Sequence, residues 1–291
     1  MKLNKVILSR CRQFIALWTL AGCLLFLVFC TAYADTKYTI YFYNPETNIN
    51  NFASLKIEFD RYLSDYGLFK FQPFSDRKTF EKFIAGKNDG VFLLSSWHYQ
   101  SLARKLPIES VLVGVSEGKS MHRKILSTKA RYITSIDSLE DIINIDSLEG
   151  KAVASSGSED YTRNILVQML GEGKKNIIDS LKILTVPKDI DALMAVVFEM
   201  ASLALTTEQG LTKLMSINLK QYGKLKHLVA SKEILLPIIA KPKQPDERVN
   251  LLLTIIEEME TSLEGRKKLK MLGIDGWKRL SKVERISLEE Q

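Results

Sequence analysis

The chain has 291 residues, of which 46% are hydrophobic and 26% are charged. This composition excludes a collagen-like chain, a disordered chain and a membrane protein with many spans. The formal charge is +7, but the first 34 residues carry four basic residues and no acidic one, which leaves 37 basic and 34 acidic residues in the rest. The remaining excess forms no dense basic stripe, so the sequence gives no indication of nucleic-acid binding.

Residues 1–34 have the layout of a secretory signal peptide. A basic start precedes the apolar run from Phe14 to Cys30, and Ala32-Tyr33-Ala34 forms a small-x-small cleavage site. We therefore expect residues 1–34 to be removed and the protein to be periplasmic. Two alternatives stay open. The apolar run of about 17 residues is near the lower limit for a retained membrane anchor, and Cys30 is a candidate site for lipid attachment.

All three cysteines precede the proposed cleavage site, so the mature chain has no disulfide, no thiolate nucleophile and no cysteine-bound metal. The three histidines have no metal-binding spacing, and the chain has no GxGxxG, GxxxxGK[ST] or GxSxG motif. We therefore expect no cofactor, no metal and no enzymatic activity.

Predicted strands and helices alternate along the mature chain, and the alternation starts again near residue 124. The predicted strands are 37–43, 68–74, 90–94, 111–115, 124–127, 151–155, 181–186, 202–206, 225–230 and 234–240. Helices are predicted over 52–66, around Phe80, Phe83 and Ile84, from the 156–158 turn to Leu170, and over 190–200, 247–263 and a last one over 264–272, with a polar helix or loop over 137–146. This alternation is typical of α/β folds in which helices cover a mainly parallel sheet.

Two such halves in one chain predict a protein with two lobes. In open parallel sheets, ligands bind beyond the carboxyl ends of the strands. Two lobes that face each other would bring both of these edges to a shared cleft, which is a common place for a small-molecule site.

Three segments, in chain order, carry a family resemblance. They are YFYNPE at 41–46 with NFASL at 51–55, DSLEGKAVASSGS at 146–158, and EGRKKL with LGI within 264–274. They resemble the first strand and loop, the strand that enters a Ser/Thr-rich helix start, and the C-terminal helix of the periplasmic phosphate/phosphonate-type substrate-binding proteins of ABC transporters. That family is a branch of the type II periplasmic binding-protein fold.

The resemblance implies a protein of two lobes that closes on a small-molecule oxyanion and catalyses nothing. Lobe 1 would comprise residues 35–123 and 235–291, and lobe 2 residues 124–234. The chain would cross between them near 118–123 and 231–236, and closure would be a hinge motion about these two crossings. The implied partner is an ABC permease, and we expect the protein to be a monomer.

A serine-rich turn between a predicted strand and a predicted helix is the first candidate contact with the solute. Free backbone N–H groups at a helix start favour an anion, and hydroxyls and a guanidinium add donors. The candidates here are Ser155, Ser156, Ser158, Thr162 and Arg163. Two observations oppose this interpretation: Ser156 with Glu159 also fits a capping box, and Glu159 and Asp160 would repel an anion.

The other candidates lie at the ends of three further strands. According to the resemblance, the segment after the third strand is a second ligand loop. These candidates are Tyr43, Asn44, Ser95, Ser96, Trp97, His98 and Thr206. The alternatives are that the aromatic side chains pack a helix end and that Asn44 forms a turn before Pro45.

The sequence therefore predicts a periplasmic solute-binding protein that captures a phosphate- or phosphonate-like oxyanion for an ABC importer. The alternative is the same fold used as a ligand sensor that docks on a signalling receptor. Glu199 and Ser202 keep that alternative open, because they stand where the resembled family has a Gly and an Asp.

Overall fold

The computed structural model describes residues 37–46, 51–130 and 152–290. The predicted helix or loop over 137–146 and the first residue of the predicted strand 151–155 lie outside these residues. All the elements below belong to one unit, Tyr38–Gln291. Within the described ranges, no helix is long and apolar enough to cross a membrane.

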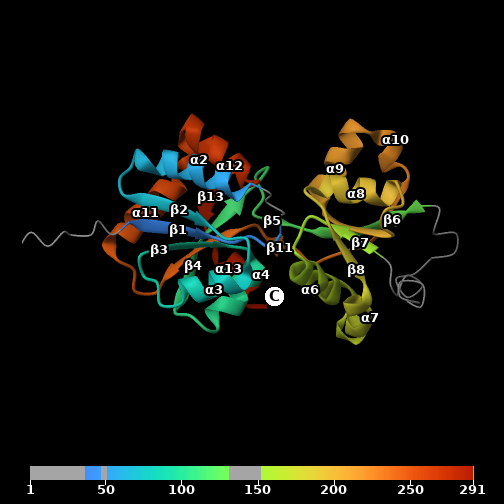
Figure 1. The fold of residues 1–291 in the computed structure, drawn as a ribbon, viewed down its shortest axis with the longest axis horizontal. Helices are drawn as coiled ribbons and strands as arrows, with labels where there is room; N and C mark the ends of the chain where they lie inside the picture. Colours follow the sequence, from blue (N-terminus) through green and yellow to red (C-terminus); the bar gives the residue numbers. More distant parts are fainter. Residues whose placement is uncertain (1–36, 47–50, 131–151, 291) are drawn as a thin grey trace, which may run out of the picture. The chain divides into compact units, whose positions relative to one another are not determined.

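A six-stranded sheet has the order β13-β4-β12-β3-β1-β2 (Figure 1). Its strands are β1 (Tyr38–Phe42), β2 (Phe69–Pro73), β3 (Gly90–Leu94), β4 (Ile108–Val115), β12 (Ile238–Pro242) and β13 (Gly276–Arg279). Strands β1 and β3 are buried along their whole length, as expected of runs rich in β-branched and aromatic residues that are covered on both faces. We call this sheet and its helices lobe 1.

The helices of lobe 1 bury aromatic and aliphatic stripes against this sheet. They are α2 (Phe52–Ser64), α3 (Arg77–Ile84), α4 (Ser96–Ala103), α11 (Glu247–Glu257), α12 (Leu263–Met271) and α13 (Lys282–Glu290), with a short 3-10 turn, Met259–Thr261, before α12. In Figure 1, α2 and α12 lie on one side of the sheet, and α3 and α4 lie on the other. Phe71, Phe80 and Leu94 are fully buried in the resulting core.

A five-stranded sheet has the order β10-β6-β9-β7-β8, and we call it and its helices lobe 2. Its strands are β6 (Lys124–Lys129), β7 (Ala152–Ser155), β8 (Lys182–Thr185), β9 (Leu203–Thr207) and β10 (Leu225–Ala230). Its helices are α6 (Glu159–Leu170), α7 (Lys175–Ser180), α8 (Asp189–Val197), α9 (Glu208–Ile217) and α10 (Leu219–Tyr222), with a 3-10 turn at Glu172–Lys174.

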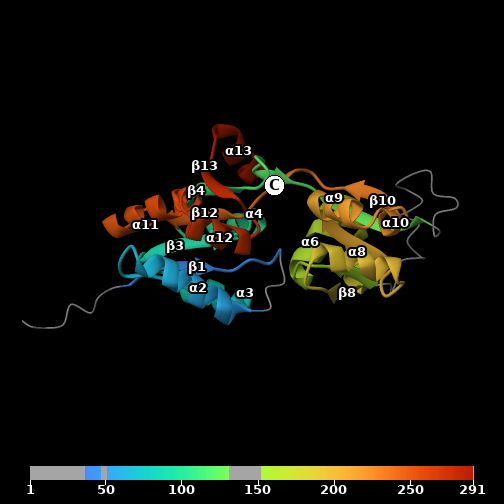
Figure 2. The same ribbon diagram turned by 90° about the horizontal axis from the view of Figure 1, so that it is seen from above.

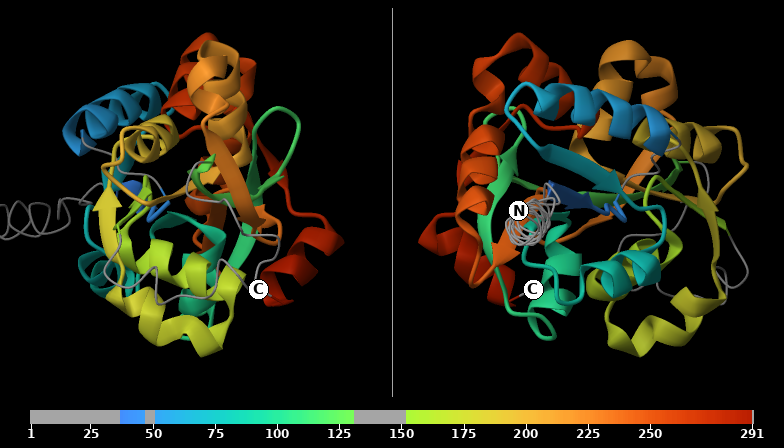
Figure 3. Two further views of the ribbon diagram at one scale, coloured as in Figure 1. Left: turned by 90° about the vertical axis from the view of Figure 1, so that its right-hand side faces the viewer. Right: turned by 60° about the vertical axis from the view of Figure 1, so that its left-hand side comes forward.

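The sheet of lobe 2 has a separate apolar cluster on each face. One cluster joins α8 and α9 to the sheet, and the other joins α6 and α7 to it. Figure 2 shows α6, α8, α9 and α10 gathered around this one sheet, and Figure 3 gives two further views of the same ribbon. The core of lobe 1 is a third cluster, so each sheet buries its own apolar side chains.

The chain passes between the two sheets twice, and the two crossings lie side by side. Strand β5 (Met121–His122) pairs antiparallel with β11 (Ile234–Leu235). The first strand after each crossing then enters the next sheet against the direction of its neighbours: β6 pairs antiparallel with β9 and β10, and β12 with β3 and β4. The residues at which one lobe gives way to the other stay a prediction.

Several expectations about the elements were wrong. The sheets are mixed: in lobe 1, β1 to β4 share one direction, while β12, which lies between β3 and β4, and the edge strand β13 run the other way. Pro237 lies between β11 and β12, so 234–240 is not a single strand. The helix from Glu247 ends at Glu257, and β13 and α13 follow the helix predicted to be the last. Phe83 is 48% exposed at the edge of the aromatic cluster.

Candidate functional site

A pocket of about 230 Å³ lies between the two sheets, beside both crossings. Its polar wall contains Asn44 and Glu46 from the loop after β1, His122 and Lys124 from the first crossing, and Ser156, Lys188, Asp189, Thr207 and Gln209 from lobe 2. Its apolar wall is formed by Leu236, Pro237, Leu272 and Ile274, with Pro187 and Gly273.

Glu46 is a buried carboxylate in this wall. Its side chain enters from a tight turn after β1, which is stabilised by a 2.9 Å hydrogen bond from Glu46 N to Asn44 Oδ1. Its Oε2 lies 3.5 Å from His122 Nε2 and 3.9 Å from Lys124 Nζ, whereas Oε1 has no hydrogen-bond partner. Burial raises the pKa of Glu46, and nearby Lys124 opposes that shift.

Lys124 and Tyr161 complete the surroundings of Glu46. Lys124 is only 5% exposed, and its ammonium lies 5.4 Å from the centre of the Tyr161 ring. The pKa of the Tyr161 phenol is raised well above its usual value by burial and by the Glu46 carboxylate beside it. Burial, with a contribution from Lys124, lowers the pKa of His122 to about 3, so this imidazole is neutral at pH 7.

Asp189 is the second carboxylate of the pocket, at the first residue of α8. It accepts hydrogen bonds from Ser156 Oγ at 2.7 Å, from Thr207 N at 2.7 Å and from Thr207 Oγ1 at 2.5 Å. Burial acts to raise the pKa of Asp189, but Lys124 and these three donors outweigh it, so the pKa is lowered and the group is charged at pH 7. One side chain thus joins β7, α8 and β9 at the edge of lobe 2.

The serine turn after β7 contacts the protein itself. Ser158 N donates to Pro45 O at 2.6 Å, and Ser158 Oγ accepts from Tyr161 N at 3.4 Å as the N-cap of α6. Ser155 Oγ accepts from Gly157 N at 3.1 Å. Ser156 is therefore not the N-cap of α6, and the alternative of a capping box formed by Ser156 and Glu159 was wrong. In this arrangement the N–H group expected to bind an anion is bonded to a carbonyl of lobe 1.

The other lobe 2 candidates lie away from the pocket. The guanidinium of Arg163 binds Glu159, Ile178 O and Leu181 O, which leaves no open fork for an oxyanion. Thr162 and Thr206 are fully buried, and their hydroxyls have no hydrogen-bond partner. Their contact with a solute stays a prediction.

The candidates after β3 form the first turn of α4 and not a loop. Ser95 Oγ accepts from His98 N at 3.2 Å as the N-cap, and Ser96 is fully buried. His98 lies 3.0 Å from Glu81 and packs edge-on against Tyr43, and burial lowers its pKa to about 4. Trp97 packs against Tyr161 of lobe 2, with ring centres 6.0 Å apart.

Comparison with known proteins decides the family. A family model described as the periplasmic substrate-binding protein of phosphonate ABC transporters matches residues 60–284. The chain belongs to this family. No curated protein matches it significantly.

Solved structures share the fold of this phosphonate-type binding protein at low sequence identity. A binding protein component of an ABC phosphonate transporter from Pseudomonas aeruginosa matches with a TM-score of 0.61 and 16% identity over 87% of this chain and 85% of its own. PhnD1 from Prochlorococcus marinus, in complex with methylphosphonate, matches with a TM-score of 0.59 and 10% identity over 88% and 97%. A Xanthomonas citri protein bound to ATP matches with a TM-score of 0.60 and 11% identity, over 88% of this chain and 95% of its own.

These findings confirm the predicted family and the type II periplasmic binding-protein fold, with helices flanking the sheets of two lobes. The protein is a phosphonate-type substrate-binding component of an ABC transporter, a family of periplasmic binding proteins and not of enzymes. Nothing in the comparisons supports the sensor alternative.

Of the residues predicted from the sequence, the pocket of this binding protein contains Asn44 and Ser156. Sequence reasoning missed Glu46, Asp189 and Lys124. The signal for Glu46 was its place within the first family-like segment. Asp189 and Lys124 had a weaker signal: Lys124 begins β6 and Asp189 begins α8, and neither lies in a family-like segment.

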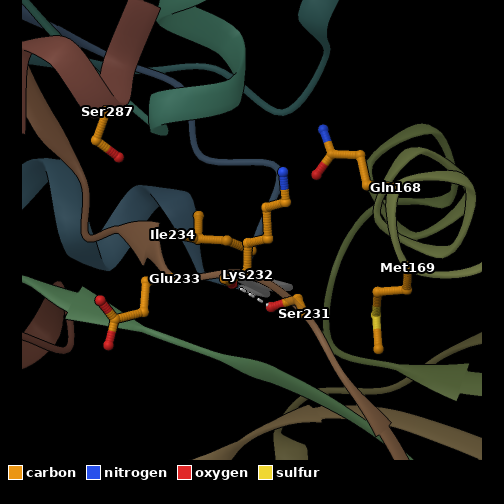
Figure 4. A pocket seen from close by; sticks show the side chains of 7 residues that line it. All are labelled: Gln168, Met169, Ser231, Lys232, Glu233, Ile234 and Ser287. Atoms are coloured by element: carbon orange, nitrogen blue, oxygen red, sulfur yellow. Dashed lines mark hydrogen bonds between the residues drawn. The ribbon is translucent and has the colours of Figure 1, made fainter. Parts of the chain in front are cut away.

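A second cavity, of about 290 Å³, lies at the return crossing (Figure 4). Its walls are Gln168 and Met169 near the end of α6, residues 231–234 of the crossing, and Ser287 of α13. Figure 4 shows Lys232 extending across it toward the side of Gln168. The cavity therefore has walls from both lobes on the side of the crossings.

Proposed function

We propose that this protein captures a small phosphonate that also carries a cationic amine, an aminoalkylphosphonate, in the pocket between its lobes. It then delivers this solute, as a monomer, to an ABC permease in the inner membrane. The signal peptide of residues 1–34 directs the chain to the periplasm and is cleaved there. Family membership supports the phosphonate part of this proposal, and the charges of the pocket support the amine.

The observation that carries the amine is the unpartnered Oε1 of Glu46. This oxygen is buried in the pocket wall and has no donor in hydrogen-bonding geometry, and the Tyr161 hydroxyl, which also has no partner, lies beside the same carboxylate. A buried carboxylate oxygen without a donor is costly, and an ammonium group supplies both the hydrogen bond and the opposite charge. Asp189, which is charged at pH 7, lies in the same wall, and Lys124 is the one buried ammonium among the described lining residues.

Size and charge also argue against a bare dianion. About 230 Å³ is below the roughly 300–1,000 Å³ of pockets for drug-sized ligands, which suits a solute with few carbon atoms. A phosphonate without a cation would place its charge next to two carboxylates. For a zwitterion, Glu46 and Asp189 face the ammonium, and Lys124, Lys188 and Gln209 can face the phosphonate.

A thermal-shift and calorimetric panel tests this proposal. The probes are 2-aminoethylphosphonate, methylphosphonate, inorganic phosphate and ethylamine. We expect 2-aminoethylphosphonate alone to bind strongly, and at 100 times its dissociation constant to stabilise the protein by about 2.7 kcal/mol. If methylphosphonate binds more tightly than 2-aminoethylphosphonate, the proposed recognition of an amine is wrong. If no phosphonate in the panel binds, the proposed function itself fails.

Paired variants locate the binding. Asp189→Asn removes a pocket charge and should weaken binding of 2-aminoethylphosphonate about tenfold or more, by the usual strength of a charged hydrogen bond. Asp191→Asn is the matched control, because Asp191 lies in the same first turn of α8 but is exposed and outside the pocket. Equal affinities of the two variants would exclude Asp189 from the site.

A further inference from the structure

A third cavity, of about 430 Å³, lies within lobe 1, at the end of the sheet opposite the interlobe pocket. Residues 86–88 precede β3, residues 106 and 107 precede β4, and residues 242–244 end β12 and follow it. Asn44 of the interlobe pocket, in contrast, follows the other end of β1, which runs parallel to β3. We propose that this cavity is a second binding site, for an organic anion with an apolar body.

The interior of the cavity is apolar. Ile84 of α3, Phe92 of β3 and Ile108 of β4 line it, and each of them is at most 5% exposed. Leu106 packs against the same core and forms another part of the wall. Because removing apolar surface from water is favourable, these walls select a ligand with an apolar body.

Backbone hydrogen bonds fix the shape of the cavity. Lys87 N donates to Ile84 O at 3.0 Å in the turn after α3, and Lys243 N donates to Pro107 O at 2.8 Å. The rings of Pro107 and Pro242 further restrict the backbone of this wall. A ligand therefore meets walls that are already in place, which lowers the cost of ordering them on binding.

The polar groups of the cavity favour a negative charge on the ligand. They belong to two lysines, Lys87 and Lys243, and to the amides of Asn88 and Gln244, and the described lining residues include no acidic one. Asn88, Lys243 and Gln244 are exposed, so these groups lie at the mouth. Two ammonium groups without a carboxylate in the same wall attract an anion and repel a cation.

The acidic residues next to the lining segments have other partners. Asp89 accepts a hydrogen bond at 2.9 Å from the hydroxyl of a β1 tyrosine, and its second oxygen lies 3.9 Å from Lys87 Nζ. Glu109 lies 3.2 Å from Lys241 Nζ. Neither of these two carboxylates is paired with Lys243 in the described part of the chain. The mouth therefore keeps a positive charge, which the anionic group of the ligand would meet.

This second site goes beyond the proposed function and does not depend on it. Isothermal titration calorimetry tests it with hexanoate, octanoate, decanoate and decylamine as probes. The protein is recovered from periplasmic extracts of cells that express the full chain. We expect the affinity for the carboxylates to rise about threefold to fourfold with each added methylene, as burial of a methylene predicts. Decylamine should bind about tenfold more weakly than decanoate. If decylamine binds as tightly as decanoate, or if no carboxylate in the series binds, the proposal is wrong.

A charge-reversal pair locates the anionic group. Lys243→Glu replaces an ammonium at the mouth by a carboxylate, and Lys70→Glu is the matched control, because Lys70 is exposed on β2 of the same lobe and outside the cavity. Substitutions of exposed side chains of this kind rarely alter the fold. We expect Lys243→Glu to weaken decanoate binding about fivefold or more and Lys70→Glu to change it less than twofold. Equal affinities of the two variants would exclude Lys243 from the site and overturn the proposal.

A second pair locates the apolar body. Leu106→Asp places a charge in the apolar wall, whereas Leu68→Asp changes a leucine that is 38% exposed and lies outside the cavity. Decanoate binding should be lost in the first variant and kept in the second, with the far-UV circular dichroism of wild type in both. If Leu106→Asp does not fold, the lysine pair alone decides.

Binding of 2-aminoethylphosphonate is measured in the same four variants and should equal that of wild type. A folded Leu106→Asp variant that binds decanoate as tightly as wild type would overturn the second site. Because the two probes are titrated separately, loss of decanoate binding reports on this cavity, and the result for 2-aminoethylphosphonate reports on the proposed function.

Discussion

Asp189 offers the sharpest test of how the edge of lobe 2 is held. Its carboxylate accepts three hydrogen bonds, one from Ser156 and two from Thr207. Asp189→Ala removes all three and leaves the Thr207 N–H without its acceptor. An unsatisfied buried donor costs about 1–3 kcal/mol, and a hydrogen bond to a charged group contributes about 1.5–3 kcal/mol. The contributions of the three bonds are not additive, because they share one acceptor group. We therefore expect Asp189→Ala to lower the free energy of unfolding by about 3–4 kcal/mol in total.

Asp189→Asn should cost less, about 1–2 kcal/mol. The amide oxygen can still accept from Thr207, and the amide N–H can face Ser156 Oγ, so mainly the charge is lost. Asp191→Ala is the control, because Asp191 is exposed in the same helical turn and its loss removes only a helix-dipole interaction of about 0.3–1 kcal/mol. Urea unfolding at pH 7, followed by circular dichroism, measures all three free energies.

The pH dependence of Asp189 has a definite sign. Since its pKa is lowered in the folded protein, its stabilisation is complete above the unfolded pKa of about 3.9 and is lost as the pH falls through the lower folded value. The difference between wild type and Asp189→Asn should therefore shrink below about pH 4. If Asp189→Ala lowers the free energy of unfolding no more than Asp191→Ala does, the three hydrogen bonds of Asp189 do not stabilise the edge of lobe 2.

Three further predictions follow from particular contacts. Gly90→Ala should destabilise the protein by about 3 kcal/mol or more, because its Cβ would lie 2.0 Å from Thr39 O, whereas Gly173→Ala, with no atom within 4 Å, should be neutral or slightly stabilising in thermal unfolding. In Glu284, burial acts to raise the pKa but the contacts with Lys278, Ser120 and Ser281 lower it to about 2. Glu284→Gln should therefore lower the free energy of unfolding by up to about 3 kcal/mol at pH 7. In denaturant titrations, this difference from wild type should vanish as the pH falls from about 4.5 to about 2. A difference at pH 2 as large as at pH 7 would contradict the prediction. Burial holds the pKa of His122 at about 3, so between about pH 6.5 and pH 3 only the unfolded chain binds a proton at this residue. The free energy of unfolding of the wild type should therefore fall by up to about 1.4 kcal/mol per pH unit in this range. His122→Gln should show a shallower slope in the same titration.

The sequence determined the parts of this protein that depend on neighbours along the chain. The runs at 38–42 and 90–94 form buried strands because they are rich in β-branched, aromatic and aliphatic residues and both faces of the strand are covered. Gly171 ends α6 with a positive φ of 95°, where a glycine was expected to stop the helix. The three family-like segments were sufficient to predict the family that the comparison confirmed.

Tertiary structure alone decided which strands run antiparallel to their neighbours and which residues of the two lobes lie in contact. The antiparallel entry of β6 and β12 follows from the two crossings and leaves no mark in local periodicity. Glu46 and Lys124 are 78 positions apart in sequence, but their charged groups lie 3.9 Å apart in the folded chain. The serine turn shows the same limit: its sequence specifies a helix start that needs an acceptor, but whether a solute or Pro45 supplies that acceptor depends on the approach of the second lobe.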